Sequence, residues 1–193
     1  MIHRDAVEIA LAVLKRLQSA CERICIAGSI RRHKPNVKDV EIVYIPCYQE
    51  EQVDMFTWEP LPATERRIRE LVGSGFLEFD TEVKRDGPKY KRLIHVASSM
   101  TIELFRANPD NWGLIVALRT GPAEFNKLLV TKPWGGGAMP AHLSMRDGYL
   151  WGQDGRIDTP TETAFFETIQ LPYWSPWERT GERLETYLRD GHQ

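Results

Sequence analysis

The sequence predicts an α+β fold: a mixed sheet with helices on one side, followed by a small C-terminal α+β domain. Two patterns indicate the first part. Apolar residues recur at helical spacing near the N-terminus, and five short β-prone runs follow between turn residues. The second part is indicated by a glycine-rich segment at 133–140, which precedes a hairpin signal. In this 193-residue chain we therefore expect one domain over residues 1–108 and another over residues 109–193.

The elements of the first domain follow from periodicity and from turn residues. Apolar residues at helical spacing from Ala6 to Leu17 predict a helix over residues 5–19. A second helix is expected to have Thr64 as its N-cap and to stop at Gly73. Runs rich in β-branched and aromatic residues predict strands over residues 24–27, 37–45, 76–83, 90–96 and 101–105.

The second domain is expected to begin with two helices that are separated by Thr120-Gly121-Pro122. Asp147-Gly148 is a typical turn signal for a β-hairpin. Thr159-Pro160-Thr161-Glu162 has the form of a T-x-x-E capping box, which predicts a helix over residues 160–169. Three tryptophans are expected to pack the small core of this domain, with stacking on a nucleobase as the alternative: Trp151, Trp174 and Trp177.

Composition and charge argue against several classes of protein. A formal net charge of −2 argues against a protein that coats nucleic acid with a broadly basic surface. No apolar run in the sequence has the length of a membrane span, and the first residues lack the apolar stretch of a secretory signal. The three cysteines include no CxxC pair, so neither a disulfide framework nor a zinc site is indicated. We therefore expect a cytoplasmic monomer without membrane contact.

Two acidic residues alternate on the strand predicted over residues 37–45. Side chains two residues apart on a strand face the same way, so Asp39 and Glu41 lie side by side while the residues between them enter the core. Glu103 leaves the apolar face of another predicted strand, which could lie beside the first. Neighbouring carboxylates repel each other unless a cation lies between them, and Mg²⁺ or Mn²⁺ prefers such oxygen ligands. We expect Asp39, Glu41 and Glu103 to hold two of these ions for phosphoryl transfer.

A glycine-serine turn lies between the first two predicted strands. Gly28 lets the backbone approach an anion closely, Ser29 offers a hydroxyl donor, and Arg32 can bind phosphate oxygens through its guanidinium group. Either signal alone is weak, because most such turns are only turns and most D-x-E strands are only solvated. Their order and spacing, together with the third carboxylate, favour a site for a nucleoside triphosphate.

The order G-S-x-R-R and then a D-x-E strand resembles the nucleotidyltransferase superfamily of DNA polymerase beta. Further along, residues 120–127 resemble the T-G-x-x-x-F-N-K segment of family X DNA polymerases, and Pro176–Arg179 resembles the P-x-x-R element that ends their thumb. The resemblance covers roughly residues 24–180 and is closest to a minimal palm-plus-thumb form. It implies a nucleotidyltransferase palm over the first domain and a thumb over the second.

The resemblance also implies roles for individual residues. The three carboxylates would be the metal ligands, with Glu103 nearest the attacking 3′-hydroxyl. The glycine-serine turn and Arg32 would hold the phosphates of the nucleotide. Further contacts are implied by position in the motif: Thr120 and Gly121 along the sugar, Asn126 at the base edge and Lys127 toward the template. Each of these downstream residues could instead have only a structural role.

The sequence departs from the family pattern at two places. Family X polymerases have aspartate at all three metal positions, whereas this chain has glutamate at two of them, Glu41 and Glu103. An extra methylene can shift a bound metal by a distance that matters for catalytic geometry. Where the polymerases have an aromatic pair before the threonine, this chain has Leu118-Arg119. Arg119 could contact the triphosphate or a nucleic-acid backbone, or could only favour the helix dipole.

Three functions are compatible with these patterns. The first is template-directed DNA polymerisation at a gap or primer end, in which a nucleoside triphosphate extends a 3′-hydroxyl. The second keeps the chemistry but transfers the nucleotide without a template to RNA, protein or a small molecule. The third is a non-catalytic module that binds DNA ends or protein, which the glutamate substitutions motivate.

Overall fold

The computed structural model describes residues 1–52, 54–83 and 85–191, and the chain folds into two compact units. The first unit comprises Met1–Ile26 and Lys34–Arg106, and the second comprises Ala27–His33 and the chain from Ala107 onward. The second unit therefore includes a short N-terminal segment in addition to the C-terminal half. The glycine-serine turn belongs to the second unit, whereas the three carboxylates belong to the first.

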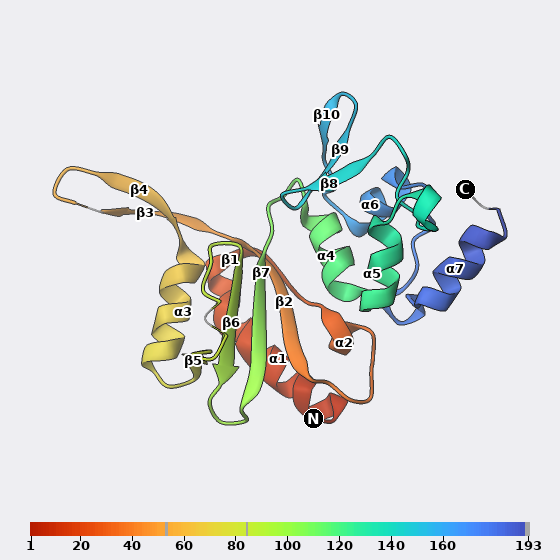
Figure 1. Cartoon of the computed structure of the whole chain (residues 1–193). Helices are drawn as coiled ribbons and strands as arrows, with labels where there is room; N and C mark the ends of the chain where they lie inside the picture. Colours follow the sequence, from red (N-terminus) through yellow and green to blue (C-terminus); the bar gives the residue numbers. More distant parts are fainter. Residues whose placement is uncertain (53, 84, 192–193) are drawn as a thin grey trace. The chain divides into compact units, whose positions relative to one another are not determined.

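The first unit is built on a mixed five-stranded sheet (Figure 1). In sheet order the strands are β1 (Cys21–Ile26), β2 (Asp39–Pro46), β7 (Met100–Arg106), β6 (Tyr90–His95) and β5 (Leu77–Phe79). β2 and β7 run parallel, and the other neighbouring pairs run antiparallel. The expected α+β class with a mixed sheet is confirmed.

Two helices, α1 (His3–Leu17) and α3 (Ala63–Gly73), pack against this sheet and against each other. Figure 1 shows α1 passing behind the strands. The central strands turn fully buried apolar side chains into the core, and these include Val40, Ile42, Leu93, Ile102 and Leu104. On α1 the buried side chains are small, with Ala6, Ala10 and Val13 among them, which lets the helix lie close to the sheet.

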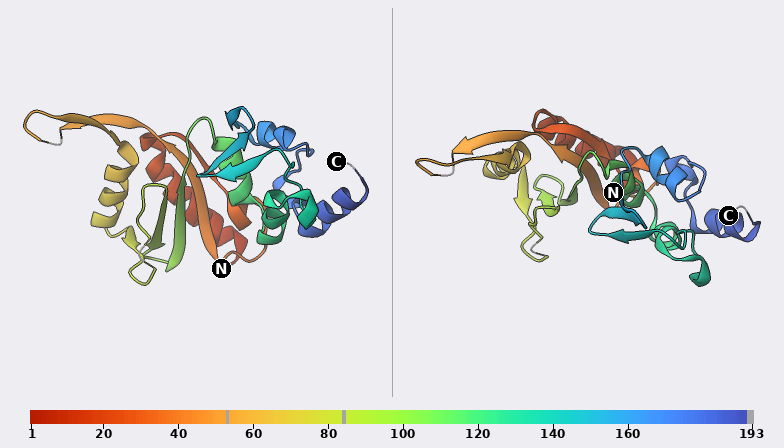
Figure 2. Two further views of the ribbon diagram at one scale, coloured as in Figure 1. Left: turned by 45° about the horizontal axis from the view of Figure 1, so that its top comes forward. Right: turned by 90° about the horizontal axis from the view of Figure 1, so that it is seen from above.

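A two-stranded hairpin of β3 (Tyr48–Gln52) and β4 (Trp58–Pro62) was not predicted from the sequence. It projects from the first unit beyond α3 (Figures 1 and 2). Near its tip the Asp54 carboxylate accepts hydrogen bonds from the backbone N–H groups of Phe56 and Thr57, both at 2.8 Å. The Phe56 side chain is 88% exposed. Because little of the hairpin is buried, its sequence lacks the apolar alternation by which a strand is recognised.

Several boundaries in the first unit differ from the prediction, and two of the differences have a local cause. Thr64 is wrong as an N-cap, because α3 begins at Ala63 with Pro62 in the N-cap position, and Thr64 is buried within the helix. The strand expected over residues 76–83 is shorter and consists of β5 alone. The carboxylate of Asp80 accepts hydrogen bonds from the backbone two and three residues ahead, which folds the chain into a turn at that point.

The second unit combines helices with a small antiparallel sheet. Its helices are α2 (Gly28–Arg31), α4 (Trp112–Thr120), α5 (Ala123–Val130), α6 (Glu162–Thr168) and α7 (Gly181–Arg189). Its strands are, in sheet order, β10 (Gly155–Ile157), β9 (Tyr149–Gly152) and β8 (Ser144–Arg146). Between β8 and β9, Asp147 and Gly148 both have positive φ, at 57° and 86°. The predicted hairpin turn is therefore confirmed.

The tryptophans of the second unit have different environments. Trp174 is 6% exposed and packs in the apolar core beside Phe125, as predicted. Trp151 is half-buried, with the guanidinium of Arg146 stacked 4.2 Å from its ring centroid. The expectation is wrong for Trp177, which is 59% exposed. It lies in a short 3₁₀ turn in which the preceding proline takes the buried position.

The capping residue of α6 is Thr161 rather than Thr159. The Thr161 hydroxyl accepts a hydrogen bond from the backbone N–H of Ala164 at 3.1 Å, and the helix begins at Glu162. Thr159 is buried, and its backbone N–H donates to the carbonyl of Asp110 at 2.7 Å. Thr159 is therefore fixed by a hydrogen bond to a residue distant in the sequence, and it does not cap the helix.

Candidate functional site

The acidic residues of β2 and β7 lie at matching positions on neighbouring strands. The parallel register places Glu41 opposite Glu103, and Asp39 precedes Glu41 by two residues on the same face. All three are half-buried, whereas Val40 between them is fully buried. Alternation on β2 and its pairing with β7 therefore bring three carboxylate positions to one face of the sheet.

Two residues of β6 contact Glu103, and the sequence analysis did not identify them. The hydroxyl of Tyr90 donates a hydrogen bond to Glu103 Oε1 at 2.5 Å. Arg92 lies opposite Glu103 in the antiparallel register, and its Nη1 is 3.6 Å from the same oxygen. On its other side, Arg92 donates from Nε to the Asp80 carboxylate at 2.7 Å. In the sequence, Tyr90 and Arg92 stand two residues apart on a predicted strand, which indicates a shared face, and the register of β6 with β7 places that face beside Glu103.

Burial and hydrogen bonds shift the pKa values of two groups near Glu103, Tyr90 and Asp80. Burial raises the pKa of Tyr90 to about 12, and its hydrogen bond to the Glu103 carboxylate acts in the same direction. The phenol therefore remains a proton donor at neutral pH. The pKa of Asp80 lies below its ordinary value, because its carboxylate accepts hydrogen bonds first from the Val83 backbone and then from Arg92.

The carboxylate face suits a hard divalent cation in its chemistry and register. Three carboxylates supply the oxygen ligands that Mg²⁺ and Mn²⁺ prefer. Among the side chains that the structure describes, however, no three acidic, histidine or cysteine residues are grouped so as to hold a metal ion. Oε1 of Glu103 is engaged by Tyr90 and Arg92. To bind Glu103 through this oxygen, a cation would have to compete with both donors.

In the glycine-serine turn, Gly28 has a backbone conformation that favours glycine. Gly28 is buried and has φ of +61°, a left-handed conformation in which a β-carbon would be strained. The hydroxyl of Ser29 is buried and has no hydrogen-bond partner among the residues that the structure describes. Because buried hydroxyls are normally paired, this group is suited to a ligand with an acceptor oxygen.

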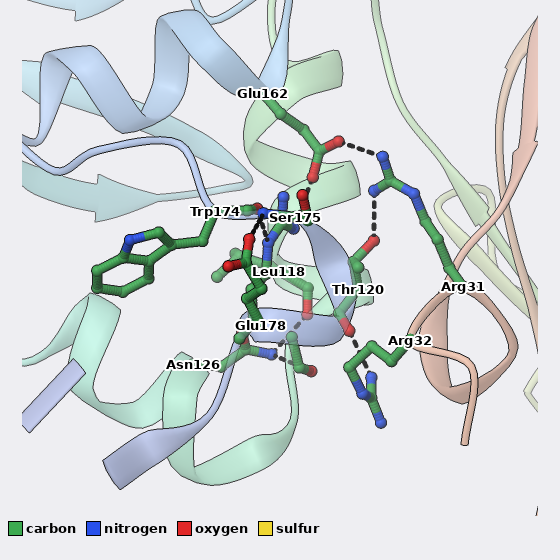
Figure 3. A network of polar contacts seen from close by, with 11 residues as sticks. Arg31, Arg32, Leu118, Thr120, Asn126, Glu162, Trp174, Ser175 and Glu178 are labelled. Carbon is green, nitrogen blue, oxygen red and sulfur yellow. Dashed lines mark hydrogen bonds and ion pairs between the residues drawn. The ribbon is translucent and has the colours of Figure 1, made fainter. Parts of the chain in front are cut away.

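The paired arginines after this turn both bind Thr120, the last residue of α4. Arg31 donates from Nη1 to the Thr120 hydroxyl at 2.8 Å, and Arg32 donates from Nη1 to the Thr120 carbonyl (Figure 3). Thr120 itself is fully buried. The motif residues Arg32 and Thr120, which are far apart in the sequence, are therefore brought together, and Arg31 joins them although no role was assigned to it.

Glu162 completes the network, as Figure 3 shows for its contact with Arg31. One carboxylate oxygen binds Arg31 Nη2 at 2.5 Å, and the other binds Arg179 Nη1 at 2.7 Å. The side chain of Arg179 is fully buried, and its Nε donates to the carbonyl of Trp174 at 3.0 Å. Glu162 thus connects the G-S-x-R-R segment to the P-x-x-R element. The sequence indicated it only as a capping residue.

Gly121 and Asn126 shape the connection between α4 and α5. The Asn126 amide donates to the carbonyls of Leu118 and Gly121, at 2.6 and 3.0 Å. Its Oδ1 is buried without a hydrogen-bond partner in the described ranges of the chain. A β-carbon on Gly121 would lie 2.3 Å from this oxygen, so any larger residue would have to displace the Asn126 side chain. In this structure the Asn126 amide holds the turn in place.

The two remaining predicted residues are exposed on helices. Arg119 lies in the last turn of α4, and Lys127 lies in the last turn of α5. Both side chains are exposed to solvent.

Comparison with known proteins supplies no family assignment: no protein-family model matches the chain, and no curated protein sequence matches it. None of the helices in residues 1–52, 54–83 and 85–191 has the length and apolar content needed to span a membrane. The function proposed below therefore depends on the residues and on their geometry.

Proposed function

We propose that the chain is a divalent-metal-dependent nucleotidyltransferase. The observation that carries the proposal is the parallel pairing of β2 with β7, which sets Glu41 opposite Glu103 and aligns Asp39 on the same face. More particularly, we propose template-directed gap filling on DNA, in the manner of a palm-plus-thumb form of the family X polymerases. The resemblance of the G-S-x-R-R, D-x-E and T-G-x-x-x-F-N-K segments supports this narrower reading.

In the proposed reaction the carboxylates of Asp39, Glu41 and Glu103 hold two Mg²⁺ or Mn²⁺ ions. Bound ions of this kind stabilise the negative charge on the attacking and leaving oxygens of a phosphoryl transfer. Glu103 is the ligand assigned nearest the 3′-hydroxyl. The Ser29 hydroxyl and Arg32 bind oxygens of the triphosphate, and the unpartnered state of the Ser29 hydroxyl supports its assignment.

The test is extension of a primer at a one-nucleotide gap in duplex DNA, with each labelled nucleotide and with Mg²⁺ or Mn²⁺. We expect incorporation opposite the complementary base. Asp39→Asn should lose several orders of magnitude in rate, because it removes a charge that holds the ions. Glu78→Gln is a matched control, since Glu78 is an exposed carboxylate on the edge strand β5. An Asp39→Asn variant as active as the parent would refute the metal-binding role of the carboxylates, and absence of incorporation by the parent would favour the non-catalytic module.

A second candidate is nucleotidyl transfer without a template. It is favoured by the hydrogen bonds of the Asn126 amide to Leu118 and Gly121, because the side chain assigned to the base edge is already engaged within the protein. The same assay separates the two functions when all four template bases are compared. Equal use of every nucleotide on every template, or labelling of an acceptor other than the primer, would favour the second candidate.

A further inference from the structure

His33 and Trp177 form an exposed aromatic pair in the second unit. Their rings are stacked, with centroids 5.4 Å apart and planes inclined by 17°. Both side chains are exposed, and Trp177 keeps 59% of its surface accessible despite the stack. An indole left accessible to this extent contributes little to a core and presents a large flat surface to a ligand.

The segments that carry the two rings are held by one carboxylate. Arg31, two residues before His33, and Arg179, two residues after Trp177, bind opposite oxygens of Glu162 at 2.5 and 2.7 Å. The side chain of Arg179 is fully buried and bound to Glu162, and this contact attaches the segment around Trp177 to the interior of the unit. Glu162 therefore fixes the two backbones beside each other and leaves the rings outside.

The local backbone conformation also restricts the position of each ring. The turn Pro176–Glu178 is closed by the Ser175 N–H, which donates to the Glu178 carboxylate at 3.0 Å, and Pro176 is buried. His33 has φ of +57°, a conformation that non-glycine residues hold mainly where the surrounding structure enforces it. Its N–H donates to the Ile30 carbonyl at 3.0 Å. The pair is thus a preorganised surface, which lowers the entropy lost when a ligand binds.

The charge of these segments indicates which ligand fits. Residues 31–33 and 176–183 contain four arginines, a histidine and two glutamates, and Glu162 binds two of the arginines. Arg179 is buried, so the accessible cations beside the rings are Arg31, Arg32 and Arg183. Exposed aromatic side chains with accessible arginines nearby are a combination that binds single-stranded nucleic acid, because bases stack on the rings and cations attract the phosphates. An acidic or purely apolar partner surface would not match both features.

We propose that His33 and Trp177 form a stacking platform for an unpaired base of a nucleic-acid strand. The proposal extends the proposed nucleotidyltransferase to its nucleic-acid substrate, with the platform receiving a base that is not paired at the gap or primer end. It requires no metal ion, since stacking and phosphate attraction are independent of the carboxylate face.

The test is fluorescence anisotropy of a labelled single-stranded oligothymidine of about 16 nucleotides, a length within the usual site sizes, with the full chain in EDTA. Trp177→Ala should weaken binding by roughly 5- to 150-fold, since one base stack contributes about 1–3 kcal/mol. Trp177→Phe should restore most of the affinity. Trp134→Ala is the matched control, because Trp134 is 77% exposed, lies in the same unit and also has a cationic neighbour, Lys132.

Several outcomes would overturn the platform. They are absence of binding by the parent, a change of less than twofold in Trp177→Ala, and an equal loss in Trp134→Ala. Thermal unfolding of each variant confirms that the fold is retained. Failure of the platform is distinguishable from failure of the proposed chemistry, because Asp39→Asn should bind the oligonucleotide like the parent in EDTA and lose only primer extension.

Discussion

Removal of Glu162 is the most informative perturbation of the second unit. Glu162→Ala would withdraw the shared carboxylate from Arg31 and Arg179 at once. The two arginines differ in whether water can replace the lost carboxylate. The side chain of Arg31 is 26% exposed and can be hydrated, whereas that of Arg179 is fully buried and cannot. The damage should therefore come mainly from an uncompensated cation in the interior.

The expected loss follows from the contacts that Arg179 keeps. Removing one partner of a buried ion pair costs about 3–5 kcal/mol of unfolding free energy. Arg179 would retain its hydrogen bond to the Trp174 carbonyl and its position over the rings of Phe166 and Tyr173, at 4.9 and 5.4 Å from their centroids. These contacts place the expected loss near the lower limit, at about 3 kcal/mol.

Urea unfolding followed by tryptophan fluorescence is the suitable assay, because five of the six tryptophans lie in the second unit. Glu162→Gln should lose less than Glu162→Ala, since an amide oxygen can still accept from one arginine. Glu8→Ala, which breaks the exposed pair Arg4–Glu8, is the control and should change the unfolding free energy by less than about 0.5 kcal/mol. A loss below about 1 kcal/mol in Glu162→Ala would refute the argument that Arg179 depends on this carboxylate.

Three further outcomes are expected. Gly121→Ala should cost about 1–3 kcal/mol in urea unfolding, because the new methyl group displaces Asn126 from its two carbonyl partners; a neutral effect would contradict this, and Gly73→Ala, with open space around the site, is the control. Arg92→Gln should tighten Mn²⁺ binding about fivefold or more in a calorimetric titration, because the guanidinium of Arg92 lies 3.6 Å from Oε1 of Glu103 and competes with a cation for that oxygen, and a pair of unit charges at about 4 Å interacts by about 1 kcal/mol even in water; unchanged or weaker binding would contradict this competition. Phe56→Ser should leave the unfolding free energy within about 0.5 kcal/mol of the parent, because the ring is exposed.

The sequence predicted the elements whose side chains alternate between core and surface. β2 and β7 are both recognisable, because Val40 and Ile102 are fully buried and the acidic residues alternate with the core. Alternation shows which side chains share a face of a strand, but it does not identify the neighbouring strand in the sheet. The pairing of Glu41 with Glu103 could thus be suggested from the sequence, and only the fold establishes it.

Other features had no local pattern to indicate them. The ion pair between Arg31 and Glu162 joins residues 131 positions apart. Thr161 and Thr159 both precede the helix, and the choice between them is made by the pairing of Thr159 with a distant carbonyl. The hairpin around Phe56 is exposed on both faces, so burial leaves no periodic signature in its sequence.

The inclusion of Ala27–His33 in the second unit has a consequence for fragments of the protein. The chain passes between the units at three places, after Ile26, after His33 and after Arg106. A fragment beginning at Ala107 would lack Arg31, so the Glu162 carboxylate would have Arg179 as its remaining arginine partner among the contacts described. Cleavage of the chain after Arg106 would likewise leave part of the second unit covalently attached to the first. The second unit is therefore not a module that can be cut from this chain intact.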